Sequence, residues 1–342
     1  MEKIDVLSLD LGELKTETQS LGMKPFRAVQ LFEWLHKKHV TSLEQMTNLS
    51  AADKEKLKEV FDFCELKTEE LQISKTDGTR KYLFALEDGS MIESVWMSYH
   101  HGNSVCVSSQ VGCRMGCTFC ASTLKGLQRN LTAGEMLSQV YAIANDTKER
   151  VSNVVIMGCG EPLDNYDNVI RFIKRLSDPD GNALSQRNIT LSTCGLVPGM
   201  LKLAEEDLQI TLALSLHAPN DDMRQKIMPV AKSFSLDSVI GACRNYFEKT
   251  GRRVTFEYSL IKGVNDTPAC ADELSRLLYG MGAHVNLIPV NPVTERGLTG
   301  TDKSGALRFK NLLEKKHINA TIRREMGRDI DGACGQLRSR HI

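Results

Sequence analysis

The sequence predicts an α/β protein: a partial parallel barrel of six β/α units, preceded by a small helical domain and a short β-meander. Three observations support this fold class. From residue 103 onward, strand-like and helix-like segments alternate. Before residue 68, apolar residues recur at helical spacing, and the stretch in between contains two hairpin-turn dipeptides. Alternation is typical of parallel βαβ units, whereas the other two patterns are typical of helices and of antiparallel strands.

Residues 1–68 are predicted to form a helical accessory domain. Five residues recur at roughly the spacing of a helix: Phe26, Val29, Phe32, Trp34 and Leu35. Ser50 followed by Asp53 resembles the capping box that starts a helix. Acidic and basic residues nearly balance in this segment, so its charge alone indicates no binding partner.

Residues 69–99 are predicted to form the β-meander. Asp77-Gly78 and Asp88-Gly89 are dipeptides that favour hairpin turns. The apolar and aromatic residues beside them favour strands. Glu93 lies in the last of these strands, where simple alternation places its side chain in solvent.

Residues 100–342 are predicted to form the main domain. Seven segments favour strands: 105–109, 154–157, 189–192, 210–216, 254–261, 285–290 and 320–323. Helical patterns lie between them, and one starts at a capping box formed by Thr132 and Glu135. In parallel α/β folds, functional residues collect at the carboxyl ends of the strands. The candidate site is therefore expected at that end of the sheet.

Composition and charge are those of an ordinary globular protein. The chain has 342 residues, of which 41% are hydrophobic and 25% charged. Its 43 basic and 43 acidic residues balance, so total charge does not indicate nucleic acid, although a local basic patch would not appear in the total. Without a signal peptide or an apolar run of about 18 residues, the chain is expected to be cytoplasmic and free of membrane spans. Its ten cysteines are then expected to be reduced.

Three of these cysteines, Cys113, Cys117 and Cys120, form a C-x3-C-x2-C pattern. Sulfur ligands select iron–sulfur clusters, zinc or copper. A 4Fe–4S cluster held only by cysteines uses four thiolates. Three close cysteines without a nearby fourth indicate a cluster with one iron left open for a substrate. A zinc site is the alternative, but it needs a fourth ligand at short spacing, and Cys106 and His101 lie upstream at unusual spacing.

Small polar residues follow several predicted strands. They are Gly160 and Glu161 after the second strand, Ser192 and Cys194 around the end of the third, Ser215, Leu216 and His217 at the end of the fourth, and Asn291 after the sixth. Glycine lets the backbone approach a ligand closely. Because parallel strands end at one edge of a sheet, we expect these residues to surround one pocket.

These motifs resemble a known family. The C-x3-C-x2-C loop resembles the hallmark of radical S-adenosylmethionine (SAM) enzymes. Five motifs resemble the RlmN-type RNA adenine methyltransferases: residues 106–113, the G-x-G-E-P run 158–162, Ser215-Leu216-His217, residues 286–289 and residues 329–337. The resemblance extends from about Lys24 to Leu337. Cys159 is a departure, since the family usually has methionine there.

The resemblance implies roles for individual residues. Cys113, Cys117 and Cys120 would hold one 4Fe–4S cluster. The SAM pocket would be lined by Gly160, Glu161, Ser192, Ser215, Leu216, His217 and Asn291. Glu161 would meet the methionine amino group of SAM, and Asn291 its ribose or methionine side.

The resemblance also implies a covalent mechanism that consumes two SAM molecules per turnover. Cys334 would first be methylated, a radical would remove hydrogen from that methyl group, and the carbon would add to the base. Cys106 would help to resolve the adduct, leaving a Cys106–Cys334 disulfide. Glu93 precedes Cys106 by 13 residues, the spacing at which the family carries a proposed proton acceptor. The electrophilic carbon between two ring nitrogens explains why ordinary methyl transfer would fail.

The implied substrates are adenosine carbon 2 in 23S rRNA and in the anticodon loop of tRNA. A low-potential electron donor such as flavodoxin is an implied partner, and the chain is expected to be a monomer. Basic residues lie near the reactive cysteines: Lys125, Arg129, Arg323, Arg324, Arg328, Arg338 and Arg340. They favour phosphate contacts, although an ordinary solvated surface is the alternative. The remaining Cys64, Cys194, Cys243 and Cys270 are expected to be core or incidental thiols.

Three alternatives stay open at this point. A Cfr-type enzyme would methylate carbon 8, although Pro162 and the run 289–291 resemble the carbon-2 group. A non-catalytic iron–sulfur protein that binds RNA or carries electrons would have no need of Cys334. A radical SAM enzyme that activates another protein would have no evident use for the Cys106/Cys334 pair.

Overall fold

The computed structural model describes residues 3–100, 102–289, 299–330 and 337. Asn291, Cys334, Arg338 and Arg340 therefore lie outside the described residues, as does His101. None of the helices in the described part of the chain combines the length and apolar character needed to span a bilayer.

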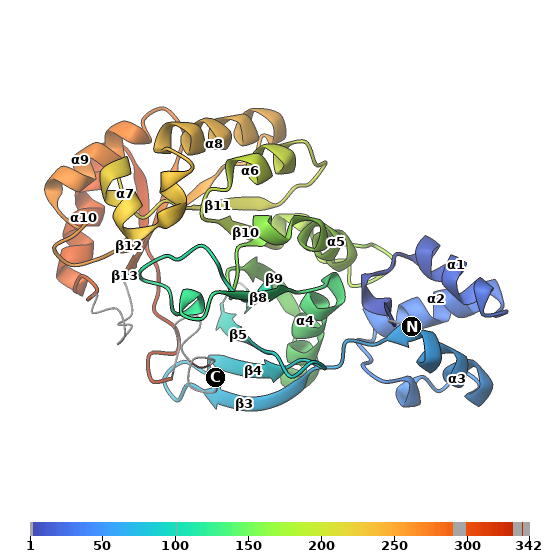
Figure 1. Cartoon of the computed structure of the whole chain (residues 1–342). Coiled ribbons are helices and arrows are strands. Elements are labelled where there is room, and N and C mark those ends of the chain that lie inside the picture. The colour runs from blue at the N-terminus through green and yellow to red at the C-terminus, as the bar shows by residue number, and fades with distance from the viewer. Residues whose placement is uncertain (1–2, 101, 290–298, 331–336, 338–342) are drawn as a thin grey trace.

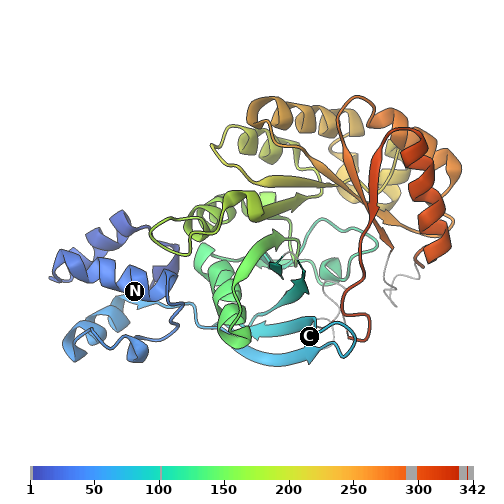
Figure 2. The same ribbon diagram turned by 180° about the vertical axis from the view of Figure 1, so that it is seen from behind.

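One ten-stranded sheet organises the molecule, with the strand order β14-β13-β12-β11-β10-β9-β6-β5-β4-β3. Its parallel part contains β6 (Gly102–Cys106), β9 (Val151–Ile156), β10 (Ile189–Thr193), β11 (Thr211–Ser215), β12 (Thr255–Leu260), β13 (His284–Pro289) and β14 (Asn319–Ile322). The sheet curves, and the helices cover its outer side (Figures 1 and 2).

Six helical connections link the parallel strands, which confirms the predicted partial (β/α)6 barrel. They are built from α4 (Ala133–Thr147), α5 (Tyr166–Leu176), α6 (Val197–Ala204), α7 (Asp221–Ile227) with α8 (Leu236–Thr250), α9 (Pro268–Leu277) and α10 (Lys303–Lys315). The predicted capping box at the start of α4 is present, with Thr132 and Glu135 bonding to each other's backbone. The core consists of apolar residues from the strands and from the inward faces of these helices.

The first barrel strand was predicted at 105–109, but β6 ends at Cys106. The chain leaves the sheet there because the buried Ser108 is bonded elsewhere. Its Oγ donates to the Glu93 carbonyl oxygen at 2.7 Å, and its amide donates to Gln139 on α4 at 2.8 Å. A short hairpin of β7 (Gln110–Gly112) and β8 (Leu127–Asn130) then carries the cysteine loop between its strands.

The β-meander consists of β3 (Lys67–Ile73), β4 (Arg80–Ala85) and β5 (Met91–Tyr99), joined antiparallel. The predicted turn glycines have positive φ, 74° at Gly78 and 79° at Gly89. Because β5 pairs with β6, the meander continues the barrel sheet. The expectation that Glu93 faces solvent is wrong, since its side chain is only 3% exposed. The alternation of side chains along a strand separates buried from exposed residues only when one face is in solvent, and both faces of β5 are buried.

The N-terminal segment contains α1 (Leu11–Ser20), α2 (Pro25–His36) and α3 (Ala51–Val60), together with a parallel pair of short strands, β1 (Ile4–Asp5) and β2 (Phe61–Asp62). Ser50 caps α3 as predicted, accepting a bond from the Asp53 amide. These helices pack beside α4 (Figure 1), where His36 Nδ1 lies 2.9 Å from the Tyr141 hydroxyl. On α2, Phe32 is buried whereas Phe26 is 49% exposed.

Candidate active site

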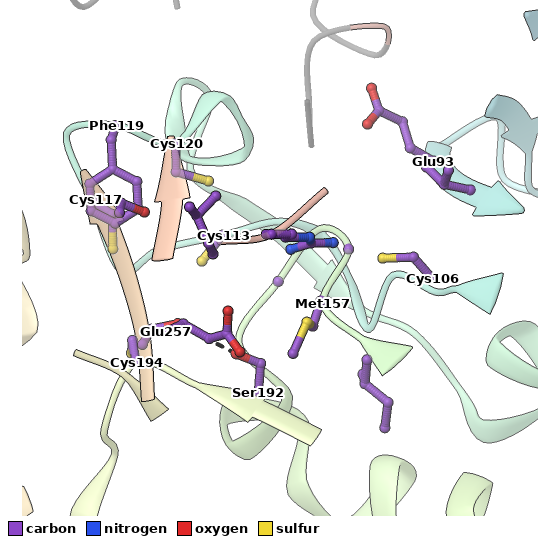
Figure 3. A pocket seen from close by; sticks show the side chains of 18 of the residues that line it. Glu93, Cys106, Cys113, Cys117, Phe119, Cys120, Met157, Ser192, Cys194 and Glu257 are labelled. Atoms are coloured by element: carbon purple, nitrogen blue, oxygen red, sulfur yellow. Dashed lines mark hydrogen bonds between the residues drawn. The ribbon is translucent and has the colours of Figure 1, made fainter. Parts of the chain in front are cut away.

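A cavity of about 620 Å³ lies where the parallel strands end, as expected for this fold class. Its lining comes from the meander, the cysteine loop, the strand ends and the segment after β14. Among the lining residues are Glu93, Cys106, Cys113, Cys117, Cys120, Gly160, Glu161, Ser192, Ser215, His217, Glu257 and Arg323. The three loop cysteines and the Glu93–Cys106 wall lie on different sides of this space (Figure 3).

The cysteine loop is fixed by its own backbone and by α7. The Cys113 amide donates to the Gly126 carbonyl oxygen at 3.0 Å, and the Thr118 amide donates to that of Ile227 at 2.9 Å. Gly112 has a φ of 81°, and a Cβ there would lie 2.0 Å from the Gly126 carbonyl oxygen. Only glycine fits this position, so the turn that presents Cys113 to the cavity is specified locally.

The three thiols are suited to a positively charged inorganic group. Burial raises the pKa of Cys113 to about 12 and also raises the pKa of Cys117 and Cys120. A coordinating metal centre deprotonates such thiols outright. Within the described ranges, no three His, Cys, Asp or Glu side chains gather around a single metal-ion position. In a 4Fe–4S cluster each thiolate has its own iron, so its ligands need not converge on one point.

Glu161 lies beside these cysteines, fully enclosed by backbone donors. Its carboxylate accepts from the Leu163 amide at 3.0 Å and from the Cys194 amide at 2.7 Å. Burial raises its pKa, and these hydrogen bonds oppose the shift. Side-chain hydrogen bonds from Thr193 and Cys194 also favour its charged form, and Glu161 lines the cavity, where an ammonium group would find an anionic partner.

The glycines on either side of Cys159 line the cavity, whereas its own side chain is buried. Ser122 Oγ, in the cysteine loop, lies 3.2 Å from the Cys159 Sγ. Cys159 therefore packs behind the cavity wall, against the cysteine loop. The departure from the family's methionine leaves the glycine surface on the cavity side in place.

Strand ends β10 and β11 bring the next predicted residues together. The Oγ atoms of Ser192 and Ser215 are 3.4 Å apart. His217 has a φ of 57°, and its Nδ1 accepts a bond from the Ser259 amide at 2.9 Å. Burial lowers its pKa to about 3, so the ring is neutral at physiological pH. The Leu216 side chain is fully buried in the core, and its backbone bonds to Arg224 and Glu257.

The opposite wall of the cavity carries a buried ion pair. Lys81 Nζ lies 3.0 Å from a Glu93 carboxylate oxygen, with side-chain exposures of 0% and 3%. Lys81, Val95 and Cys106 lie opposite one another on β4, β5 and β6, so they share one face of the sheet. Burial raises the pKa of Cys106 to about 11, although the positive charges of Arg323 and Lys81 act to lower it.

Two buried charged residues at or beside the cavity were missed by sequence reasoning. The first is Lys81. The hairpin turn at Asp88-Gly89 was the signal in the sequence, because it indicates that the strand of Lys81 pairs with the strand of Glu93. Glu257 on β12 is the other: it is buried, it accepts a bond from Asn286 Nδ2 at 2.9 Å, and burial raises its pKa while Arg323 opposes the shift. Its signal in the sequence is an acidic residue inside an otherwise apolar strand.

The predicted basic residues divide into two groups. Arg323, Arg324 and Arg328 line the cavity, and Arg328 also forms an ion pair with Glu325 of the same segment. Arg129 is instead held by acidic neighbours, with bonds of 2.6 Å to Asp88 and 2.7 Å to Glu135. Arg129 is therefore already paired within the protein.

Replacing Gly160 by alanine is expected to destabilise the protein and weaken SAM binding at least ten-fold. Gly160 has a φ of 109°, and a Cβ there would lie 2.7 Å from that of Gln110. Such strain costs about 1–3 kcal/mol before the clash is counted. Gly263→Ala is the matched control, because Gly263 has a φ of 71° but open space around it. Urea unfolding and equilibrium SAM binding measure the difference. Equal effects of the two substitutions on SAM affinity would contradict the expectation.

Comparison with known proteins agrees with this geometry. Residues 107–271 match the family model of the radical SAM superfamily, and residues 4–62 match that of the ribosomal RNA large subunit methyltransferase N-terminal domain. A protein from Lachnoclostridium phytofermentans, called a probable dual-specificity RNA methyltransferase RlmN, is 60% identical over 98% of this chain and 95% of its own length. A relative of the same name from Lachnospira eligens is 58% identical over 99% and 97%.

A solved structure extends the similarity to the fold. The crystal structure of a radical SAM methyltransferase from Sphaerobacter thermophilus has a TM-score of 0.94 and 42% identity. The match covers 97% of this chain and 98% of that one. Family membership implies a 4Fe–4S cluster and SAM, which the thiol-lined cavity fits. On the strength of full-length similarity in both sequence and structure, the chain belongs to the RlmN family of radical SAM methyltransferases.

Proposed function

We propose that this enzyme methylates carbon 2 of adenosine in 23S rRNA and in the anticodon loop of tRNA. The observation that carries the proposal is one cavity that brings the three loop cysteines together with Cys106 and Glu93. The names of the relatives, dual-specificity RNA methyltransferases, agree with two kinds of RNA substrate. Enzymes of this family are named as methyltransferases, which disfavours a purely structural iron–sulfur protein.

Cys113, Cys117 and Cys120 would hold the 4Fe–4S cluster. Gly160, Glu161, Ser192, Ser215, His217 and Asn291 would bind SAM, and Leu216, the remaining residue of the expected set, would support them from the core. The cluster and SAM together supply, when bound, a carbon radical that abstracts hydrogen. Glu161 would accept bonds from the methionine amino group. His217, neutral and held through Nδ1, would offer an uncharged polar wall beside Ser215.

Cys334 would first take a methyl group from one of two SAM molecules. That methyl group would then lose one hydrogen atom, and its carbon would add to the adenine. Cys334 would thereby become bonded to the base through this carbon. Glu93 would accept the proton that leaves carbon 2 of the base, and the unpaired electron left on the adduct would pass to the cluster. The Cys106 sulfur, as a thiolate, would then attack that of Cys334. The bond between Cys334 and the carbon attached to the base breaks, and that carbon takes up a proton to become the methyl group. A disulfide forms that an external two-electron reductant must reduce.

The paired charge of Lys81 keeps the Glu93 carboxylate beside Cys106 in this scheme. The high pKa of Cys106, about 11, means that its thiol holds its proton at neutral pH. Cys106 must therefore transfer that proton to a base before it attacks, and only the thiolate is an effective nucleophile.

RNA would approach over the cavity mouth. Arg323, Arg324 and Arg328 lie there and suit phosphate groups, whose contacts position the nucleic acid without reading its sequence. The target adenine must leave its stack to enter a cavity of this size. We further propose that the protein acts as a cytoplasmic monomer and receives electrons from a low-potential donor such as flavodoxin.

Product mapping tests the proposal. Reconstituted protein, SAM and a reductant are incubated anaerobically with rRNA and tRNA, and modified adenosines are identified by mass spectrometry. We expect 2-methyladenosine and 5′-deoxyadenosine, with Cys334→Ala producing no methylated RNA. Cys106→Ala is expected to accumulate RNA bonded to the protein, visible as a shifted band on denaturing gels. A product methylated at carbon 8 would instead assign a Cfr-type activity.

A further inference from the structure

The segment of residues 323–330, here called the strap, connects two distant edges of the sheet. It follows β14, one edge strand, and ends beside the turn after β3, the other edge strand. Figures 1 and 2 both show it passing from the end of β14 to the end of the β3–β4 hairpin. Arg323, Gly327 and Ile330 of the strap line the cavity. The strap therefore closes the partial barrel on the side where the strands leave a gap.

Reciprocal aspartate contacts hold the strap to the turn of residues 74–79. Asp329 of the strap accepts bonds from Ser74 Oγ at 2.6 Å and from the Lys75 amide at 2.8 Å. In return, Asp77 of the turn accepts a bond from the Gly327 amide at 2.9 Å. We call these three bonds the strap anchor. Each segment supplies a carboxylate to the other, which fixes both the position and the direction of the strap.

Both carboxylates of the anchor are ionised at physiological pH, so they can accept these hydrogen bonds. Although burial opposes the shift, bonds from Thr79, Gly327 and Ser74 lower the pKa of Asp77 to about 2. Bonds from Ser74 and Lys75 lower the pKa of Asp329. Gly327 has a φ of 63°, and a Cβ there would lie 3.0 Å from the Ile330 side chain. The strap thus turns tightly at Gly327, which brings Ile330 over the cavity.

The anchor fixes the chain on one side of Cys334, and Leu337, which is fully buried three residues further on, fixes it on the other. Cys334 follows Asp329 by five residues but follows Arg323, whose amide still bonds to the sheet, by eleven. Full extension allows about 18 Å from the anchor and about 40 Å from the end of β14. Without the anchor, eleven residues rather than five would separate Cys334 from the nearest held point before it in the chain.

We propose that the strap anchor is a positioning device that keeps the methyl-carrying Cys334 in reach of the cavity, with Asp329 and Asp77 as positioning residues. This inference rests on the role proposed for Cys334. None of the residues proposed to hold the cluster or SAM belongs to the strap, so SAM binding and SAM cleavage are expected to depend on the anchor far less than chemistry at Cys334 does. Methylation of Cys334, and transfer of that carbon to RNA, do depend on it. Loss of the anchor therefore uncouples SAM cleavage from RNA methylation.

Asp329→Ala tests the inference, with Asp88→Ala as the matched control. Asp88 lies in the neighbouring hairpin turn and accepts a bond from the Ser90 amide at 2.9 Å, but its partners Ser90 and Arg129 lie outside the strap. Three quantities are measured on the reconstituted proteins: SAM affinity, the fraction of S-methylated Cys334, and methylated RNA formed per 5′-deoxyadenosine. For Asp329→Ala we expect unchanged SAM affinity and at least a three-fold fall in the other two. Asp88→Ala is expected to match the wild type in all three.

The double variant Asp77→Ala/Asp329→Ala is expected to be no worse than Asp329→Ala alone, because both carboxylates serve one anchor. Hydrogen exchange of residues 323–330 should rise in the single variant, which reports loss of the contact without using activity. A wild-type coupling ratio in Asp329→Ala, or an equal loss in Asp88→Ala, would overturn the inference. Failure of the proposed function would show differently, as wild-type protein that never carries S-methylated Cys334.

Discussion

Cys117→Ala is expected to abolish both SAM cleavage and RNA methylation. Cys117 supplies one of three thiols that face the cavity from a single loop, and an iron–sulfur cluster is held by its cysteine thiolates. The variant should therefore contain little iron or acid-labile sulfide after reconstitution and should lack the visible absorbance of the wild type. Iron analysis and mass spectrometry of 5′-deoxyadenosine give the measurement. We expect both signals at background.

Cys243→Ala is the control for Cys117→Ala. Cys243 is fully buried on α8, and, like Cys117, has its pKa raised by burial. Its replacement should cost about 1 kcal/mol of stability, the usual effect of a single core substitution. Its iron content and SAM cleavage should equal those of the wild type. Retention of a complete, active cluster in Cys117→Ala would show that a different set of ligands holds it.

Lys81→Met is expected to lower the free energy of unfolding by about 3–5 kcal/mol, the usual cost of removing one partner from a buried ion pair. The ammonium of Lys81 balances the Glu93 carboxylate at 3.0 Å, where both side chains are almost fully enclosed. Without it, a buried negative charge loses its paired cation. Urea unfolding of the cluster-free protein measures the change. RNA methylation by the reconstituted variant should fall as well, since Glu93 is the proposed proton acceptor.

The exposed pair of Lys249 and Glu205 provides the matched control for Lys81→Met. Their side chains are 41% and 64% exposed, so Lys249→Met should cost no more than about 1 kcal/mol. The double variant Lys81→Met/Glu93→Gln, which removes both charges, should recover most of the stability lost in Lys81→Met. That recovery would not restore methylation if Glu93 accepts the proton. Equal costs for Lys81→Met and Lys249→Met would contradict the electrostatic account.

The features that the sequence predicted well depend on local pattern. The C-x3-C-x2-C loop and the capping box of Thr132 and Glu135 each lie within a few residues, so their spacing carries their geometry. The alternation of strands and helices likewise predicted the barrel. The strand pattern also predicted that Glu161 and Ser215 lie close together, because both follow parallel strands that end at one edge of the sheet.

The features that the sequence did not predict depend on which strands become neighbours. Glu93 was placed in solvent by alternation, but alternation distinguishes faces only where one of them is solvated. The pairing of Lys81 with Glu93 requires the register of the β4–β5 hairpin. The approach of Arg323 to Cys106 requires the whole sheet order, since β14 and β6 are separated by five strands within it. The β1–β2 pair was missed because two residues per strand leave no periodic signal.

The meander that extends the barrel sheet has a consequence for how such enzymes can diversify. The cluster loop and the strand-end residues belong to the parallel half of the cavity wall, whereas Lys81 and Glu93 belong to the antiparallel half. The two halves meet at the ladder between β5 and β6. Substitutions in the meander can therefore alter proton handling and the shape offered to a base while radical generation is preserved. On the roles proposed above, a substitution at Glu93 would impair proton transfer while leaving the three proposed cluster ligands in place.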